Sequence, residues 1–225
     1  MVAVKIVHFS DLLCIWGHIG EANVYQLAET FGARVELAIH FCSVFPDTGS
    51  KIGKGWAGRG GFDGYAAHVR DVAARFPGHD IHPDTWVKAR PLSSASPQLM
   101  VKAIALIEAG QAPCSFAERP SVRAATALRR AFFTEGRDIA NWAEQRQVCR
   151  EIGLAFEEVT ARIETGEAIA SLAADYELAH AQAVQGSPTY ILNEGRQKLF
   201  GNIGFGILSA NVGELLTDED ENASA

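Results

Sequence analysis

The chain has 225 residues, of which 48% are hydrophobic and 21% charged, and its net charge is −7. This composition is typical of a globular protein with one or two domains and a sizeable core. The negative charge argues against nucleic acid as a partner, and no apolar run is long enough to span a bilayer. The first ten residues enter a strand-like pattern without the features of a signal peptide, so we expect a cytoplasmic protein with reduced thiols.

The chain begins with a strand–helix–strand pattern. Val2–Phe9 is short, β-branched and partly alternating, which predicts a strand. Leu13–Phe31 has apolar residues at helical spacing and ends at Gly32. Val35–Phe41 predicts a second strand, and the length of the unit indicates that the two strands are parallel. The Gly-, Pro- and Ser-rich stretch Ser43–Gly61 predicts a loop.

The middle of the chain is predicted to be helical, with glycines at several helix ends. The predicted helices are Asp63–Phe76, Pro97–Ala109, Val122–Thr134, Ile139–Ile152, Ala155–Thr165 and Ala168–Gln185. Strand patterns return at Thr189–Asn193 and Arg196–Phe200, which flank a Glu194-Gly195 turn and predict a hairpin. Phe205–Leu216 predicts a closing helix, and the acidic residues after it are expected to be frayed.

This order of elements predicts an α/β fold in which the two ends of the chain share one sheet. Neither end is large enough to bury a core alone. We therefore expect residues 1–60 and 186–217 to form one discontinuous domain. Residues 61–185 would be a helical insertion domain, and residues 218–225 a flexible acidic tail.

The four cysteines are far apart in the sequence and have no zinc-ligand spacing. Cys42 ends a predicted strand and Cys149 lies within a predicted helix, so both are expected in the core. Cys114 follows a proline in an exposed-looking loop. Cys14 lies where a helix begins, and the unpaired N–H groups and dipole there favour an anion. Its pKa should therefore fall and its thiolate should be reactive, unless it is a small buried apolar residue.

The neighbours of Cys14 each have two interpretations. Trp16 either forms an apolar rim around the sulfur or packs against the helical block. His18 either hydrogen-bonds near the thiolate and, as a cation, lowers the pKa of Cys14, or is a surface histidine.

Two other patterns look functional but lack the required context. Residues 53–58 (GKGWAG) match a dinucleotide-binding pattern, yet no strand directly precedes them, so we expect a mobile loop over the active-site side. His79 and His82 flank acidic residues in an irregular stretch with no fixed spacing. We therefore expect no metal site there.

Three segments, in order, resemble the DsbA-type thioredoxin-like family. "FSDLLCIWG" resembles its strand-to-helix turn Phe-x-Asp-x-x-Cys-x-x-Cys, and "AVQGSPTYIL" resembles its cis-proline loop. "LRRAFFTEGRDIANWAEQRQVCREIGL" resembles a helix pair of the insertion in cytoplasmic members. The resemblance implies a thioredoxin-like fold with an all-helical insertion, Cys14 as nucleophile and Pro188 as the cis-proline. It also implies that Ser187, with Thr189 beside it, binds an extended substrate or glutathione through its backbone.

The chain departs from this family at Gly17, where the dithiol enzymes have a second cysteine. Related branches, similar to kappa-class glutathione transferases and 2-hydroxychromene-2-carboxylate isomerases, bind glutathione without a dithiol. Without a second thiol, a mixed disulfide on Cys14 must be released by glutathione or by a distant cysteine, for which Cys114 is the candidate.

The leading hypothesis is a thiol–disulfide oxidoreductase or isomerase that acts on protein disulfides through Cys14 alone. Glutathione would be its co-substrate, and no tightly bound cofactor is expected. One alternative is a glutathione-dependent isomerase or transferase of aromatic small molecules, in which Cys14 orients the glutathione thiol. Another is a redox-silent peptide-binding module. A homodimer is left open because related folds often pair.

Overall fold

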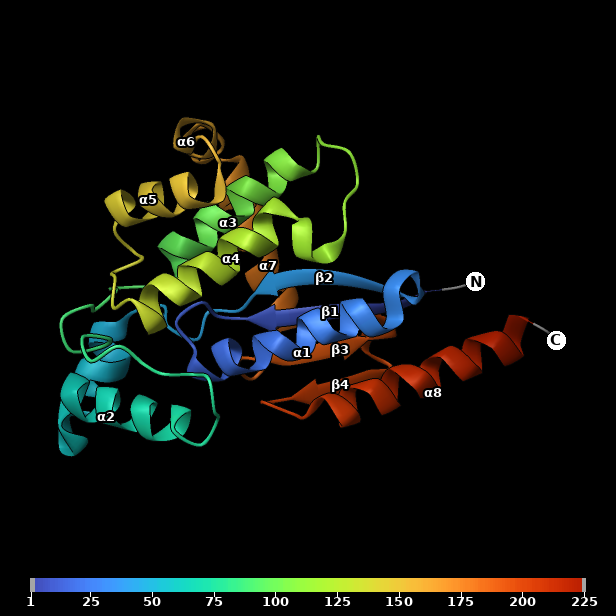
Figure 1. Ribbon diagram of the computed structural model, residues 1–225, viewed down its shortest axis with the longest axis horizontal. Coiled ribbons are helices and arrows are strands. Elements are labelled where there is room, and N and C mark those ends of the chain that lie inside the picture. The colour runs from blue at the N-terminus through green and yellow to red at the C-terminus, as the bar shows by residue number, and fades with distance from the viewer. Residues whose placement is uncertain (1–2, 224–225) are drawn as a thin grey trace.

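The computed structural model describes residues 3–223, which fold around a four-stranded mixed sheet with the strand order β2-β1-β3-β4 (Figure 1). The strands are β1 (Val4–Ser10), β2 (Val35–Phe41), β3 (Thr189–Leu192) and β4 (Gln197–Phe200). β1 is parallel to β2, with Val4 opposite Val35, and antiparallel to β3, with Phe9 opposite Thr189. The predicted parallel pair is therefore confirmed, although the predicted start at Val2 lies outside the described residues.

The connection between β3 and β4 spans residues 193–196, two residues more than predicted, and turns through Asn193, Glu194 and Gly195. Their φ angles are 44°, 62° and 105°, all in the left-handed region. Asparagine and glycine adopt this region more readily than other residues. The side chain of Asn193 also accepts a hydrogen bond from the Lys5 backbone N–H at 2.9 Å, which fixes the turn against β1.

Helices cover both faces of the sheet. α1 (Ile15–Phe31) and α8 (Phe205–Ala223) lie on one face, and α7 (Glu167–Ala181) lies on the other (Figure 1). The core of the first face consists of Val4, Ile6, Val24, Leu27, Phe31, Tyr190, Leu192, Leu208, Val212 and Leu215. The core of the second face contains Phe9, Cys42, Ala179 and Ile191. This two-sided burial is why all four residues of β3 (TYIL) are buried.

The remaining helices lie between β2 and β3 in the chain, as expected for an insertion, and the domain boundaries stay a prediction. They are α2 (Gly61–Ala73), α3 (Ala95–Glu108), α4 (Pro120–Arg129), α5 (Trp142–Ile152) and α6 (Phe156–Glu164), followed by α7. Pro120 starts α4, and Gly153, with a φ of 77°, ends α5. One apolar cluster joins these helices to the first turns of α1, so the insertion packs directly over the N-terminus of α1.

The prediction of a loop over Ser43–Gly61 is wrong for part of this stretch, which includes residues 53–58, the predicted mobile loop. Residues Gly49–Lys54 form a π-helical segment and Ala57–Arg59 a 3₁₀ turn. Ile52 is fully buried, and the ring of Trp56 packs edge-on against Tyr65 at 5.0 Å. These two apolar anchors hold the glycine-rich stretch against α2.

The predicted frayed tail is also wrong within the described residues. α8 continues past the predicted end at Leu216 to Ala223. The residues from 217 to 223 contain neither proline nor glycine, so nothing in them stops the helix. No helix in the described part of the chain is long and apolar enough to cross a membrane.

Candidate active site

Cys14 is the residue immediately before α1, and its extended backbone has φ −86° and ψ 120°. Its N–H donates to the Asp11 carbonyl at 3.2 Å, and its carbonyl accepts from the His18 N–H at 3.0 Å. The fully buried Leu12 and Leu13 anchor this turn in the core. The sequence therefore places the sulfur at a helix N-terminus, as predicted.

The cis-proline loop lies against the sulfur. The Cys14 thiol donates to the backbone carbonyl of Ser187 at 3.3 Å, and the Ser187–Pro188 peptide bond is cis. Thr189 starts β3, and its hydroxyl donates to the Gly186 carbonyl at 2.7 Å, which closes the loop. The fold thus joins two segments that lie at opposite ends of the sequence.

The predicted low pKa of Cys14 is wrong. The side chain is only 6% exposed, and this burial raises the pKa of its thiol. Hydrogen bonds from the Gly17 and Trp16 backbone and from the Ser187 side chain lower the pKa, but by less. The nearby Asp11 carboxylate adds to the rise. The helix N–H groups therefore do not replace the water that the sulfur loses, and the free protein holds Cys14 as a thiol at neutral pH.

Gly17 occupies a space that admits no larger residue without rearrangement. A Cβ added there would lie 2.7 Å from Ser10 Oγ, 2.9 Å from Ser187 Oγ and 3.2 Å from the Asp11 carbonyl oxygen. The two serine hydroxyls are hydrogen-bonded to each other at 3.3 Å. They fill the space into which a second cysteine would project.

Asp11 ties the active-site turn to the end of β2 and the start of α3. One carboxylate oxygen accepts from Leu13 N–H at 2.9 Å. The other accepts from the Val44 and Phe45 N–H groups at 2.9 and 3.1 Å and from Ser94 Oγ at 2.7 Å. Burial raises the pKa of this carboxyl despite these bonds. The sequence analysis quoted Asp11 within a motif but gave it no role, because a sequence pattern does not reveal its distant partners.

Arg129 is a site neighbour that the sequence analysis missed. It lies at the end of α4 and is 4% exposed. Its guanidinium donates to Ser10 Oγ at 2.8 Å and to the Glu21 carboxylate at 2.7 Å. The sequence feature that could have indicated this role is an arginine beside the apolar residues Ala125 and Leu128 of the same helix.

His18 is a neutral ring within the insertion interface. It stacks on Phe133 at 4.7 Å between ring centroids and meets His79 edge-on at 5.3 Å. Burial, and then the charge of Arg129, lower the pKa of His18 to about 3. The hypothesis that a cationic His18 lowers the pKa of Cys14 is therefore wrong. Trp16 packs edge-on against Phe76 at 5.9 Å, in agreement with the packing interpretation.

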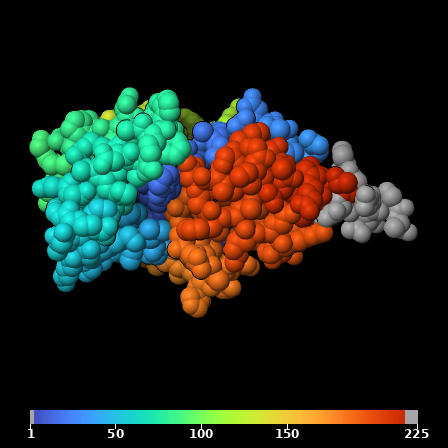
Figure 2. Space-filling view, turned by 90° about the horizontal axis from the view of Figure 1, so that it is seen from below, coloured from blue at the N-terminus to red at the C-terminus, as the bar shows by residue number. Residues whose placement is uncertain are grey.

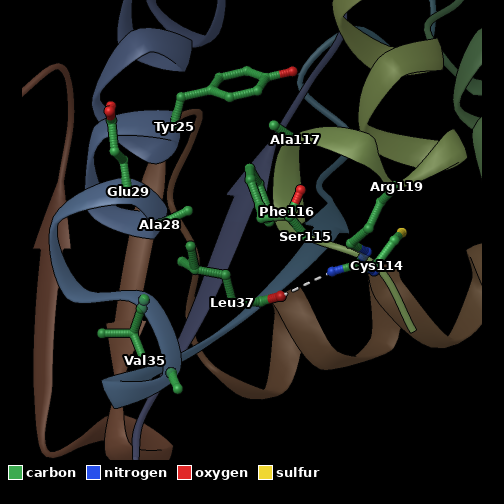
Figure 3. A pocket seen from close by; sticks show the side chains of 12 residues that line it. Tyr25, Ala28, Glu29, Val35, Leu37, Cys114, Ser115, Phe116, Ala117 and Arg119 are labelled. Atoms are coloured by element: carbon green, nitrogen blue, oxygen red, sulfur yellow. Dashed lines mark hydrogen bonds between the residues drawn. The ribbon is translucent and has the colours of Figure 1, made fainter.

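Cys114 lies far from Cys14. It lines a separate cavity of about 640 Å³ beside the second half of α1, where Tyr25, Glu29 and Arg119 also lie (Figure 3). Tyr25 is roughly 16 Å along the helix axis from Cys14, at 1.5 Å per residue. The structure does not bring the two cysteines together, so the proposed role of Cys114 as a resolving thiol within the chain is wrong for this conformation.

Cys42 and Cys149 are buried, as predicted. Burial raises the pKa of Cys149 to about 11 and also raises that of Cys42, to which the neighbouring Asp11 and Cys14 contribute. No group of three or more metal-ligating side chains occurs among the described residues, His79 and His82 included.

A cavity of about 320 Å³ adjoins the cis-proline loop. Its lining consists of Ile19, Asn23, Phe76, Pro77, His79, Asn202, Ile203 and Gly204. Gly20 lies between Pro188 of the loop and Asn202 of this lining, because a Cβ added there would be 3.5 Å from Pro188 Cγ and 3.4 Å from Asn202 Oδ1. In Figure 2 the blue N-terminal segment is visible in a depression between the cyan segment that includes α2 and the orange and red C-terminal part.

This arrangement of a cysteine beside a cis-proline loop can be compared with known proteins. Residues 105–211 match the family model of the DSBA-like thioredoxin domain. The chain therefore has a DsbA-like thioredoxin fold. Among curated proteins no significant match is found.

Solved structures extend the DsbA-like likeness to almost the whole chain. A putative protein disulfide isomerase from Nitrosomonas europaea is 14% identical, with a TM-score of 0.67 over 99% of this chain and 100% of that one. The cytosolic disulfide reductase DsbM from Pseudomonas aeruginosa, with GSH, is 17% identical, with a TM-score of 0.64 over 98% and 100%. A 2-hydroxychromene-2-carboxylate isomerase is 14% identical, with a TM-score of 0.62 over 96% and 98%. At these identities the DsbA-like chain shares the fold of these proteins.

Proposed function

We propose that this DsbA-like protein is a thiol–disulfide oxidoreductase or isomerase that works through Cys14 alone, with glutathione as co-substrate. The observation that carries the proposal is the pairing of one thiol with the cis-proline loop. Cys14 Sγ lies 3.3 Å from the Ser187 carbonyl, while two hydroxyls fill the space beside Gly17. The DsbM structure with GSH supports glutathione as the partner.

The chemistry balances without a second protein thiol. Cys14 first loses its proton to solvent, and its thiolate then attacks a glutathione–protein mixed disulfide. A Cys14–glutathione disulfide forms as the substrate thiolate leaves. A second glutathione thiolate attacks that disulfide, which releases oxidised glutathione and restores the Cys14 thiolate. Because burial raises the pKa of Cys14, we expect the rate to keep rising with pH above about 8.5, the pKa of a free cysteine.

Mass spectrometry of the reduced protein after exposure to oxidised glutathione tests this proposal. The Cys114→Ser variant is used because Cys114 is exposed and would itself react. We expect a mixed disulfide on Cys14 and turnover of a glutathionylated peptide, both of which are lost in a Cys14→Ser variant. A Cys14–Cys42 disulfide would contradict the single-thiol mechanism, and an unmodified Cys14 would contradict the reactive thiol.

A second function is favoured by the protonated state of Cys14. A thiol held neutral by burial is a hydrogen-bond donor, and in this protein it donates toward the cis-proline loop. Such a donor would orient the thiolate of bound glutathione, which would then react with an aromatic small molecule. The shared fold with a 2-hydroxychromene-2-carboxylate isomerase supports this alternative.

The Cys14→Ser variant separates the two functions. Serine retains a donor but cannot form a mixed disulfide. Glutathione-dependent isomerisation of 2-hydroxychromene-2-carboxylate would survive in Cys14→Ser and fall in Cys14→Ala. Peptide binding without either activity in the parent protein would instead indicate a redox-silent module.

A further inference from the structure

We infer that Arg129 and Ser10 are positioning residues that aim the Ser187 hydroxyl at the sulfur of Cys14. The inference rests on the proposed function only in taking Cys14 as the reactive group. It starts from a continuous series of hydrogen bonds. Arg129 donates to Ser10 Oγ at 2.8 Å, Ser10 Oγ lies 3.3 Å from Ser187 Oγ, and the backbone carbonyl of Ser187 accepts from the Cys14 thiol at 3.3 Å.

The direction that we infer for this series runs from Arg129 toward Cys14. A guanidinium can only donate, so Ser10 Oγ must accept from Arg129. The Ser10 hydrogen is then free to be donated to Ser187 Oγ. Ser187 Oγ also accepts from the Asp11 backbone N–H at 3.0 Å, which occupies its second acceptor position. The hydrogen of Ser187 is then available to another acceptor. The Cys14 sulfur, which lies 3.3 Å from the carbonyl oxygen of the same residue, is the acceptor that we assign to it.

The other end of the series is fixed by packing. Arg129 is 4% exposed, and its second nitrogen donates to Glu21 of α1 at 2.7 Å. Glu21 also accepts from Thr126 Oγ1 at 3.0 Å. The guanidinium is therefore held between Glu21 of α1 and Ser10 of β1.

The consequence is selective stabilisation of the thiolate. In the neutral state the Cys14 thiol donates to the Ser187 carbonyl, so it needs no donor from the hydroxyl. Once ionised, the sulfur can only accept, and a hydroxyl already oriented toward it costs no reorganisation. Without Arg129, Ser10 can rotate so that its oxygen accepts from the Ser187 hydroxyl, and the thiolate loses this partner.

The pH dependence of Cys14 alkylation by iodoacetamide tests the inference. The measurement is made in the Cys114→Ser background and needs no glutathione, so it stands even if the proposed function fails. We expect Arg129→Met to move the midpoint upward by about one pH unit and to slow alkylation at pH 8 about tenfold. Burial raises the pKa of the neighbouring Cys42 and Tyr65, so neither group ionises in this pH range. The Asp11 carboxyl and the neutral His18 ring are present in every variant, so they do not contribute to the difference between variants.

A double-mutant cycle shows whether Arg129 acts through Ser10. Ser10→Ala should move the midpoint in the same direction, and adding Arg129→Met to Ser10→Ala should add no further shift. Shifts that add, or an unchanged midpoint in both single variants, would overturn the inference. Arg119→Met is the matched control, because Arg119 pairs with Glu108 and with the Leu37 carbonyl, away from the thiol.

A conservative variant covers the case in which Arg129→Met does not fold. Arg129→Lys keeps the charge, but its single ammonium cannot replace the fork that reaches both Glu21 and Ser10. Its midpoint should move toward that of Ser10→Ala. If the midpoint of Arg129→Lys stays at the parent value while that of Ser10→Ala moves, Arg129 has no positioning role.

Discussion

Gly17 shows how one residue without a side chain shapes the site. Two hydroxyls and a backbone carbonyl approach its Cα so closely that a Cβ would lie within 3.2 Å of all three. The hydroxyl pair of Ser10 and Ser187 is held from the other side by Arg129. The glycine is therefore part of a packed polar arrangement, and restoring a cysteine at this position would displace the residue that precedes the cis-proline.

Gly17→Ala is expected to destabilise the protein by about 1–3 kcal/mol, because overpacking outweighs the helix propensity of alanine. Gly20→Ala is the matched control one turn later in α1. The nearest atom to its added Cβ is 3.4 Å away, so this variant should be neutral or more stable by up to about 1 kcal/mol. Urea denaturation measures both. Equal effects at the two positions would contradict the steric account of Gly17.

Elements far apart in the chain are joined by buried charges. Asp175 of α7 is 2% exposed and accepts from His40 at 2.6 Å and the Phe41 N–H at 2.9 Å, both in β2. It also accepts from Lys102 of α3 at 2.9 Å. One carboxylate thus connects the sheet edge to two helices, in a position where water cannot replace it.

Asp175→Ala is expected to lower the free energy of unfolding by about 3 kcal/mol, because it leaves a largely buried ammonium and a buried backbone donor without their acceptor. Asp175→Asn should cost less, since its amide oxygen still accepts from Phe41. Glu167→Gln at the start of α7 is the control, because its pair with Arg162 is exposed. Chemical denaturation should leave that control at the parent value. A small loss in Asp175→Ala would show that Lys102 finds another partner.

The whole molecule encloses histidines that are neutral in the folded state. His8 of β1 is 3% exposed and stacks on Tyr190 at 4.7 Å, and neither ring nitrogen has a hydrogen-bond partner among the described residues. Burial, with the charge of Arg129, lowers the pKa of His8 to about 3, as it does for His18. As the pH falls, His8 and His18 are therefore protonated in the unfolded chain before they are protonated in the folded protein.

Stability should consequently be full above pH 6.5 and fall as the pH drops from 6.5 toward 3. Each histidine should contribute a loss of about 2 kcal/mol between pH 7 and pH 5. Urea denaturation at the two pH values measures the total. His8→Phe keeps the ring against Tyr190 but cannot titrate, so it should remove about half of the loss. An unchanged pH dependence in His8→Phe would mean that His8 is protonated in the folded protein.

The local sequence determined the elements and the two halves of the site. The β-branched runs gave the parallel pair and the C-terminal hairpin, and Cys14 and Pro188 are recognisable because strand-to-helix turns and X-Pro loops are local features. The error after Leu216 has a local cause, whereas the error at Ser43–Gly61 has a tertiary one. The anchoring of Ile52 against α2 outweighed a glycine-rich composition, and a helix without a stop signal continued.

Only the tertiary structure decided the chemical state of the site. The sequence places Cys14 at a helix N-terminus, but the pKa of its thiol depends on whether water reaches the sulfur, and the insertion excludes that water. The same applies to Arg129 and Ser10, whose contact joins distant parts of the chain. Desolvation and hydrogen-bond direction are properties of a packed environment. A sequence read residue by residue therefore identifies the thiol but not what surrounds it.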